Sequence, residues 1–219
     1  MAITRRELMT GVLTAAAGAA AAAPALADWL GSADDSGAQR PKPQPGGAAL
    51  RLSPTPECDD GDAEPTPAGI QGPFYTPNTP ERADLREPGT VGAPLILLGR
   101  IVNPDCQPLP GAVLDLWSAD GNGVYDNQGY RLRGHLKADR NGLFRVQTVK
   151  PGAYGDRGGR RTPHIHVRAQ GRGTRLLTTQ LFFPGEALNA QDGLFDRKLV
   201  VNLAHDGGML VARFDFVLG

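Results

Sequence analysis

The chain has 219 residues, of which 40% are hydrophobic, and its 23 lysines and arginines are balanced by 23 aspartates and glutamates. A formal charge of zero gives no electrostatic basis for binding nucleic acid or an anionic membrane surface, so neither is expected as a partner. With 29 glycines and 19 prolines, the sequence favours strands and turns over helices, in one domain with additional tails.

Residues 1–27 have the features of an export signal. The segment 4–8 (Thr-Arg-Arg-Glu-Leu) resembles the twin-arginine pattern, an apolar run covers 11–23, and Ala25-Leu26-Ala27 is a small-residue cleavage site. A membrane anchor is the alternative, but the run is shorter and richer in alanine than a spanning helix of about 20 residues requires. We therefore predict a cleaved twin-arginine-type signal, a periplasmic or extracellular location, and no membrane attachment after cleavage.

Residues 28–68 are rich in Gly, Ser, Asp and Pro and show little hydrophobic periodicity, which is typical of a flexible arm. The arm contains Cys58, and the second cysteine of the chain, Cys106, lies in a predicted turn before a strand. Two cysteines in an exported chain favour a disulfide between Cys58 and Cys106 over two free thiols. Neither thiol is expected to belong to a metal site.

From residue 69 onward the sequence predicts one all-β domain, 69–219. Short apolar or alternating segments of strand length recur between turn signals. The expected strands cover 95–102, 112–117, 162–169, 176–183, 196–203 and 209–217, and a hairpin around Asn141-Gly142 spans 134–146. About eight or more short strands with long loops indicate a β-sandwich, and more than a hundred residues suffice for its core.

The sequence His164-Ile165-His166 stands out within this domain. Side chains two residues apart in a strand leave the same face, so both imidazoles point to one place and Ile165 points to the opposite face. Imidazole is the commonest protein metal ligand. A half-buried strand that happens to carry two histidines is the alternative interpretation.

Two tyrosines occupy glycine-rich turns rather than apolar strand faces. Tyr125 follows Asp-Gly-Asn-Gly-Val, and Tyr154 lies between Ala153 and Gly155 after a Pro-Gly pair. Two phenolates and two imidazoles form a hard, anionic donor set that suits Fe(III), whereas the usual non-haem Fe(II) site has two histidines and one carboxylate. The distance between these residues in the sequence leaves their grouping open.

The order of these motifs resembles the intradiol ring-cleavage dioxygenases, which include the protocatechuate 3,4-dioxygenases and the catechol 1,2-dioxygenases. The segments that carry the resemblance are Trp117-Ser-Ala-Asp-Gly-Asn-Gly-Val-Tyr125, Asp139-Arg-Asn-Gly-Leu-Phe144, Pro151-Gly-Ala-Tyr154-Gly, Arg161-Thr-Pro-His164-Ile-His166 and Leu177-Thr-Thr-Gln180. The similarity covers roughly residues 72–219. The chain departs from the family pattern at Ser118, where His is frequent, and at Thr162-Pro163, where Pro-Ala is frequent.

The resemblance implies a non-haem Fe(III) enzyme that cleaves a catecholic ring with O2 between its two hydroxyl-bearing carbons, giving a cis,cis-muconate-type diacid. Its iron ligands would be Tyr125, Tyr154, His164 and His166. Tyr154 would also act in catalysis, by leaving the iron when the substrate binds. Arg161 would stabilise negative charge that develops on the substrate. The alternatives are a surface role for Arg161, or an alignment shifted by one residue to Arg160.

Two further residues match the family less specifically. Gln180 matches a position close to the site, and a simple strand amide is the alternative. Tyr75, in a Gly-Pro-Phe-Tyr segment that approaches the active-site mouth in the family, would line the substrate pocket or take a packing role. The identity of the catechol stays open, although the lack of a predicted helical segment before Gly72 favours the protocatechuate type or an exported branch. The oligomeric state stays open too, and a homo-oligomer is compatible with the sequence.

A second hypothesis comes from a different functional class. In this hypothesis the chain is an exported, metal-free β-sandwich that binds a partner or acts as a spacer, similar to the small modules found beside carboxypeptidases. Gly99-Arg-Ile-Val, Pro108-Leu-Pro-Gly-Ala-Val and 139–144 are compatible with it. This hypothesis accounts for the strands and turns, but not for two tyrosines in glycine turns together with His164 and His166.

Overall fold

The computed structural model describes residues 63–155 and 159–219. The predicted signal and most of the predicted arm, including Cys58, lie outside the described residues. Export and the disulfide with Cys106 therefore stay predictions. In the part of the chain that is described, no helix has the length and apolar character needed to cross a lipid bilayer.

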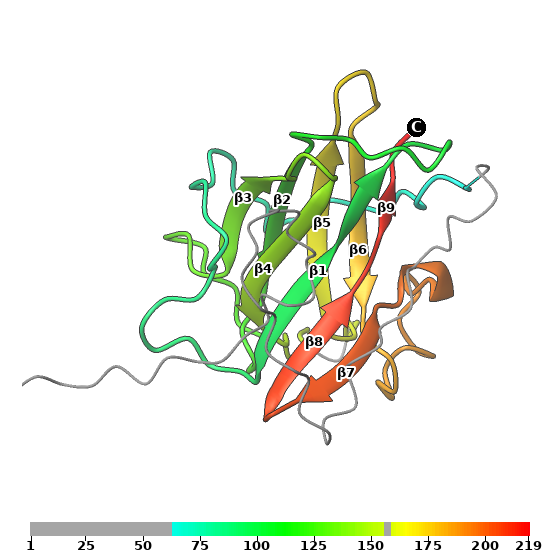
Figure 1. The fold of residues 1–219 in the computed structure, drawn as a ribbon. Coiled ribbons are helices and arrows are strands. Elements are labelled where there is room, and N and C mark those ends of the chain that lie inside the picture. The colour runs from blue at the N-terminus through cyan, green and yellow to red at the C-terminus, as the bar shows by residue number, and fades with distance from the viewer. Residues whose placement is uncertain (1–62, 156–158) are drawn as a thin grey trace, which may run out of the picture. The chain divides into compact units, whose positions relative to one another are not determined.

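The described residues form strands and one short 3-10 helix. These are β1 (Pro94–Val102), β2 (Val113–Ser118), β3 (Arg133–Lys137), β4 (Leu143–Val149), β5 (His164–Gln170), β6 (Leu177–Phe182), η2 (Arg197–Leu199), β7 (Asn202–Asp206), β8 (Met209–Arg213) and β9 (Phe216–Val217). One sheet has the order β4-β1-β8-β7, with β9 paired to β1, and the other has the order β3-β2-β5-β6. Figure 1 shows the first sheet in front of the second. The predicted all-β sandwich is confirmed.

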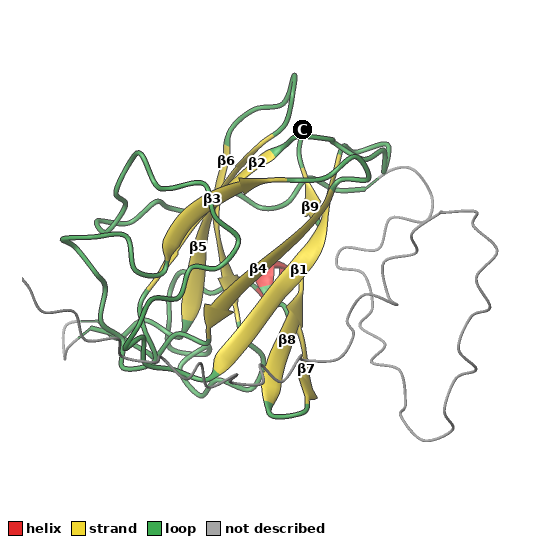
Figure 2. Ribbon diagram, turned by 60° about the vertical axis from the view of Figure 1, so that its left-hand side comes forward, coloured by secondary structure: helices red, strands yellow, loops and turns green. Residues whose placement is uncertain are grey.

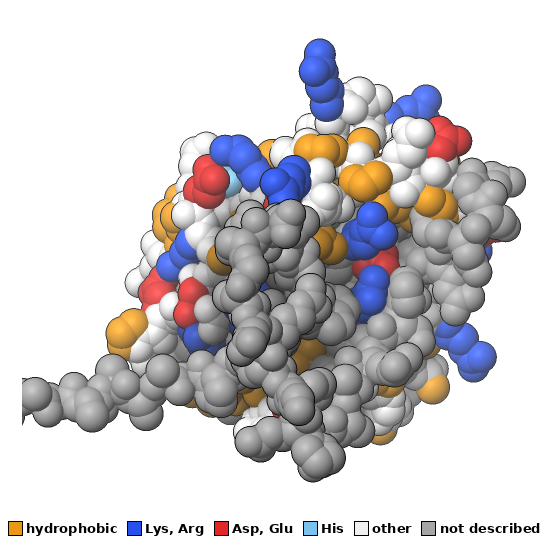
Figure 3. Space-filling view, viewed as in Figure 1, with side chains coloured by type: hydrophobic (Ala, Val, Ile, Leu, Met, Phe, Trp, Pro, Cys, Tyr) orange, Lys and Arg blue, Asp and Glu red, His pale blue; other side chains and the backbone are white. Residues whose placement is uncertain are grey.

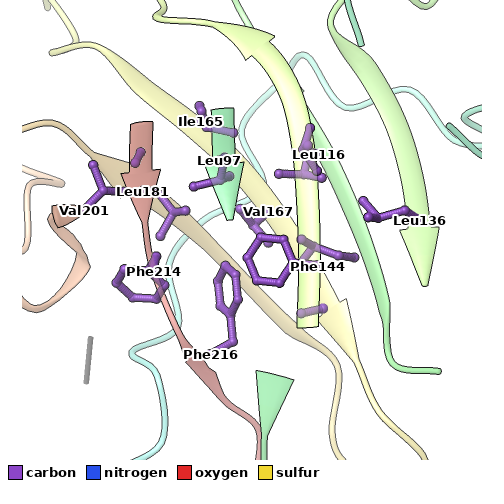
Figure 4. Close-up of a cluster of buried hydrophobic side chains, with 14 of the residues drawn as sticks. Leu97, Leu116, Leu136, Phe144, Ile165, Val167, Leu181, Val201, Phe214 and Phe216 are labelled. Carbon is purple, nitrogen blue, oxygen red and sulfur yellow. The ribbon is translucent and has the colours of Figure 1, made fainter. Parts of the chain in front are cut away.

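The core lies between the inner faces of the two sheets. Leu97 of β1, Leu116 of β2, and Ile165 and Val167 of β5 are at most 2% exposed and belong to one cluster, whose side chains point toward one another in Figure 4. Fully burying an aliphatic side chain of this size stabilises the fold by about 1.5–3 kcal/mol. Because side chains alternate along a strand, the residues between these core positions emerge on the outer face of the β3-β2-β5-β6 sheet.

The predicted hairpin around Asn141-Gly142 is wrong, although the turn itself forms. The carboxylate of Asp139 accepts hydrogen bonds of 2.8 Å from the backbone N–H groups of Asn141 and Leu143. The flanking strands β3 and β4 nevertheless belong to different sheets. Leu136 and Phe144, on either side of the turn, reach the common core from opposite sheets. Burial of the two apolar side chains therefore selects the strand partners, and the turn carries the chain across the sandwich.

The strand expected over 196–203 is wrong in its first half. Asp196 caps the helix η2 by accepting a hydrogen bond of 2.9 Å from the backbone N–H of Lys198, and β7 begins only at Asn202. An aspartate side chain that binds nearby N–H groups favours a cap over a strand ladder. The following residues Gly207-Gly208 take the two left-handed conformations of a tight hairpin between β7 and β8.

The domain begins a few residues before the predicted boundary at 69. The Ala63 N–H donates to the Pro104 carbonyl at 2.9 Å, and the Thr66 N–H donates to the Val217 carbonyl at 3.0 Å. Ala63 also packs in a small buried cluster with Val102 and Val217. The end of the predicted arm is therefore part of the folded domain.

The segment 69–82 crosses the outer face of the β3-β2-β5-β6 sheet. At one edge, the Gly69 N–H donates to the carbonyl of Thr178 in β6 at 2.8 Å. At the other edge, the Arg82 N–H donates to the carbonyl of His135 in β3 at 2.9 Å. Figure 2 shows loops gathering on this side of the sandwich, beyond β3 and β5. This crossing covers the face that carries the two histidines.

Basic and acidic side chains are mixed on the surface. Figure 3 shows them next to one another on the visible face. Lys137 and Glu81 approach to 3.1 Å, and Lys198 and Glu64 to 2.6 Å. Because solvent and salt screen exposed pairs of this kind, they contribute little to the stability of the fold and serve solubility.

Candidate metal centre

β5 places the side chains of His164 and His166 on the outer face of its sheet, while Ile165 joins the core as predicted. The two Nε2 atoms are 3.1 Å apart. The Nδ1 atom of His164 is 2.6 Å from the carbonyl oxygen of Thr162 and must carry the proton of that hydrogen bond. This tautomer leaves the Nε2 lone pair of His164 available to a metal ion.

Trp117 of β2 fixes the plane of the His166 ring from one side. The two residues are direct partners in the ladder, and their rings stack 4.8 Å apart with 4° between their planes. Gly72 crosses close to the same imidazole, with a left-handed φ of 72°. A Cβ atom at residue 72 would lie 3.1 Å from His166 Cε1. Glycine at this position therefore allows the covering segment to pass over the histidine.

The two turns that carry the tyrosines pack backbone against backbone. The Gly152 N–H donates to the Asp120 carbonyl at 2.8 Å. A Cβ atom on Gly123 would lie 2.3 Å from the carbonyl oxygen of Ala153, which is closer than any side chain could approach. The glycine-rich surroundings that are unusual for tyrosine in the sequence are thus what bring these two turns into contact.

The four predicted ligands, Tyr125, Tyr154, His164 and His166, form one cluster. The ring centroids lie 5.2 Å apart for the two tyrosines, 4.7 Å apart for the two histidines, 6.3 Å apart for Tyr125 and His166, and 5.4 Å apart for Tyr154 and His164. Within the described residues, no group of three or more His, Cys, Asp and Glu side chains is placed to hold a metal. A donor set larger than the histidine pair therefore needs the phenol oxygens.

Tyr125 lies deeper than Tyr154. Its side chain is buried, whereas Tyr154 is half-buried. The Tyr125 hydroxyl has no hydrogen-bond partner of acceptable geometry among the described residues. Burial and then the neighbouring Tyr154 raise the pKa of Tyr125. An unpartnered buried hydroxyl costs about 1–3 kcal/mol, and a cation bound at this oxygen would remove that cost.

The histidines are held in the neutral form that a metal ligand requires. Burial lowers the pKa of His164 to about 4 and that of His166 to about 2. The pKa of His166 is lowered further by its neighbour His164. The positive charge of Arg161 lowers the pKa of both rings as well.

Arg161 is oriented by side chains from other segments. Its backbone forms a bridge with Tyr154. Its Nε donates to Asp192 Oδ2 at 2.9 Å, and its Nη2 donates to Gln180 Oε1. Gln180 is the ladder partner of His166 in β6 and donates through Nε2 to the Ile70 carbonyl at 3.1 Å. The structure thus places both predicted neighbours, Arg161 and Gln180, beside the four rings.

Asp192 links Arg161 to His164, and no local pattern in the sequence singles it out. Only 1% of its side chain is exposed. Besides Arg161, it accepts hydrogen bonds from the backbone N–H groups of Thr162 at 2.9 Å and Leu194 at 3.0 Å. Burial alone would raise the pKa of Asp192, but these three donors lower it below its usual range. The carbonyl of Thr162 in turn holds the His164 ring.

Two other residues considered from the sequence lie differently. Arg160 is exposed, which agrees with Arg161 as the residue directed toward the cluster. The hydroxyl of Tyr75 donates to Asp115 Oδ2 at 3.2 Å, and its ring meets Trp117 edge-on at 4.9 Å. The guanidinium of Arg168 covers the Tyr75 ring at 4.8 Å. These contacts fit the packing role for Tyr75 rather than a place in a substrate pocket.

Comparison with known proteins gives consistent matches. A family model described as "Dioxygenase" matches residues 70–219. A catechol 1,2-dioxygenase from Acinetobacter baylyi is 32% identical over 154 residues, which are 58% of this chain and 49% of that protein. A 6-chlorohydroxyquinol 1,2-dioxygenase from Cupriavidus pinatubonensis is 31% identical over 194 residues, which are 77% of this chain and 69% of that protein. The chain therefore spans about half the length of the first relative and about two thirds of the second.

A solved structure extends the likeness to three dimensions. It is the dioxygenase domain of a dioxygenase carbohydrate-binding protein fusion from Streptomyces sp. SirexAA-E, with 43% sequence identity and a TM-score of 0.67. The match covers 71% of this chain and 98% of that domain. The described sandwich and the loops that carry the four rings fall within the matched family region.

Proposed function

Because the chain belongs to the intradiol ring-cleavage dioxygenase family, we propose that it is a non-haem Fe(III) enzyme that cleaves a catecholic ring with O2 between the two hydroxyl-bearing carbons. The observation that carries the proposal is the convergence of two phenols and two imidazoles from three separate segments. A metal-free spacer module would have no use for this arrangement, so the second hypothesis from the sequence loses its support.

The residues present fit a ferric ion. Two phenol oxygens and two imidazole nitrogens are hard or borderline donors, and two phenolates would balance two of the three positive charges. The histidines are neutral, as metal binding requires. The buried Tyr125 hydroxyl lacks a hydrogen-bond partner among the described residues, and it would bind the ion as a phenolate, with loss of its proton. Tyr125, Tyr154, His164 and His166 would therefore hold the ion.

When bound, the ferric ion would supply Lewis-acid chemistry that draws electron density from the catechol ring. Tyr154 is half-buried, so its phenol oxygen can move away and accept a proton from a substrate hydroxyl. Tyr125 is enclosed, with the Phe74 ring stacked on it at 4.4 Å, and stays in place. Arg161 is held by Asp192 with its permanent charge toward the site, where it stabilises negative charge on the reacting ring.

The proposed product is a cis,cis-muconate-type diacid: the bond between the two hydroxyl-bearing carbons breaks, each of these carbons becomes a carboxyl carbon, and both atoms of O2 are incorporated. Trp117 closes one face of the His166 ring, so the substrate would approach from the side of the less buried Tyr154. The substrate class is a ring with two adjacent hydroxyls.

Purified mature protein tests the proposal directly. It should hold one ferric ion per chain, show a visible tyrosinate absorption band, and convert at least one member of a panel of catechols to a diacid of the expected mass. Tyr125→Phe should shift the band, and His164→Ala should lose the ion. A folded protein that stays colourless after loading with iron would rule out the enzyme.

We also propose export through a twin-arginine signal, on the basis of residues 1–27. This route carries folded proteins, which suits a chain that must bind its metal before export. The N-terminal sequence of the exported protein should begin near Asp28. Peptide mapping without reduction should link Cys58 to Cys106, and alkylation of both thiols in the exported protein would show that the bridge is absent.

A further inference from the structure

Arg133 is a fully buried arginine, with 0% exposure, on the outer face of the sheet that carries the histidines. It is the ladder partner of Trp117 at the end of β3. Within the described ranges it forms no ion pair, although isolated buried charges are costly. Burial accordingly lowers the pKa of Arg133. Because burial of this charge is unfavourable, we examined which hydrogen bonds the guanidinium makes.

The guanidinium binds the two segments that enclose Tyr125. Its Nε donates to the carbonyl of Asp126, the residue that follows the tyrosine, at 2.8 Å. Its Nη1 donates to the carbonyl of Phe74, whose ring stacks on Tyr125. Its Nη2 reaches Asn127 Oδ1 at 3.3 Å, and its Cζ lies 5.9 Å from the centre of the Tyr125 ring. One planar guanidinium thus joins the backbone after Tyr125 to the backbone of Phe74, whose ring covers Tyr125.

The backbone before Arg133 is held in a strained conformation that directs this guanidinium. Leu132 has a left-handed φ of 57°, a conformation that is unfavourable for residues other than glycine. Its N–H donates to the Leu85 carbonyl at 2.8 Å, and its carbonyl accepts from the Ser118 N–H at 3.2 Å. The Arg133 carbonyl accepts from both Nε and Nη2 of Arg82, at 3.0 and 2.8 Å. Contacts on both sides therefore fix the direction in which the Arg133 side chain leaves the strand.

We propose that Arg133 is a positioning residue for the metal centre, which holds the phenol oxygen of Tyr125 at the point where the two histidine Nε2 atoms meet. This inference rests on the proposed function. Arg133 touches neither the metal nor the substrate in this account. It acts through Tyr125, by fixing the chain on both sides of the ring and by placing a positive charge near an oxygen that becomes anionic when it binds the ferric ion.

The test measures ferric affinity by competition with a chelator, together with the visible band, in the full mature protein. Arg133→Met keeps the length and removes the guanidinium and its charge, and Arg133→Lys keeps only the charge. Arg140→Met is the control, because Arg140 is exposed in a turn. Arg133→Met should weaken ferric binding about tenfold or more, as losses of residues that support metal ligands do, and should shift the band. Arg133→Lys should fall between wild type and Arg133→Met, and Arg140→Met should match wild type.

A double-mutant cycle separates this role from plain stabilisation of the fold. In a Tyr125→Phe background, Arg133→Met should change ferric affinity by less than about twofold, whereas in a Tyr154→Phe background the full loss should persist. Equal losses in both backgrounds would overturn the inference, as would lower thermal stability with unchanged affinity and band. If Arg133→Met does not fold, Arg133→Lys is taken through the same cycle and decides. A wild-type protein that binds iron but cleaves no catechol would refute the proposed function and leave this test intact.

Discussion

Replacing Asp192 by asparagine would test whether the network around Arg161 supports both the fold and the chemistry. Both carboxylate oxygens accept hydrogen bonds: Oδ1 from the Leu194 N–H and Oδ2 from the Thr162 N–H, while Arg161 Nε approaches both. All of these partners are donors. Whichever way an asparagine amide turns, its NH2 group faces a backbone N–H, so one hydrogen bond is replaced by a repulsive contact.

The size of the effect follows from the burial of the pair. Removing one partner of a buried ion pair typically costs about 3–5 kcal/mol. The side chain of Asp192 is 1% exposed and that of Arg161 is 16% exposed, and Gln180 still binds Arg161, so the lower end of this range applies. We expect Asp192→Asn to lower the free energy of unfolding by about 3 kcal/mol. Because Arg161 loses its anchor, the rate of ring cleavage should fall as well, by up to about a hundredfold.

The pH dependence of this difference provides a second measurement. The pKa of Asp192 is lowered in the folded protein, so its contribution is present above the ordinary value of 3.8 and is lost as the pH falls through the lower folded value. Urea unfolding of wild type and Asp192→Asn should therefore give a constant difference from about pH 7 down to about pH 4, which shrinks below that. Asp206→Asn, at an exposed hairpin end, is the control. A difference that persists undiminished in strong acid, or an unchanged cleavage rate, would refute this reasoning.

Three further changes probe the same site. Arg161→Leu should keep iron and colour but slow the reaction about a hundredfold, while Arg160→Leu, at an exposed position, should be nearly neutral in the same turnover assay. Gly72→Ala should weaken iron binding, measured by chelator competition, because its Cβ would crowd His166 in a left-handed conformation. The free energy of unfolding of the iron-free protein, measured with urea, should fall by a few kcal/mol between about pH 6.5 and 5. In this range the histidines of the unfolded chain bind protons, whereas His164 and His166 of the folded protein, with pKa values of about 4 and 2, stay neutral.

Features that depend on local periodicity could be predicted from the sequence. The alternation in β5 places His164 and His166 on one face and Ile165 in the core, as period-two geometry requires. The Asn141-Gly142 turn also formed, yet it joins two sheets instead of two paired strands. Turn chemistry is set by a few neighbouring residues, whereas strand pairing is decided by where distant apolar faces are buried. Local signals therefore predict elements better than their partners.

The grouping of the four proposed ligands depends on long-range contacts that residue patterns alone do not contain. Tyr125 and Tyr154 meet because Gly123 lies against Ala153, a contact between two loops that no local pattern predicts. The resemblance to a known family predicted the grouping, because members of a family share the fold that brings these residues together. Asp192 lies in the long connection after β6 without a motif, and its role appears only when its three donors are seen around it.

The four proposed ligands are divided between one strand of a sheet and two loops. His164 and His166 are fixed by the ladders of β5 with β2 and β6, and a shift of register by one residue would place Ile165 outward and both histidines in the core. The core packing of β5 therefore guarantees the direction of the imidazoles. The tyrosines have no such guarantee and depend on loop contacts, which enclose Tyr125 under Phe74 and leave Tyr154 half-buried. In the proposed reaction only the less enclosed phenol has to move, so the difference in burial between the two loops matches the difference in their roles.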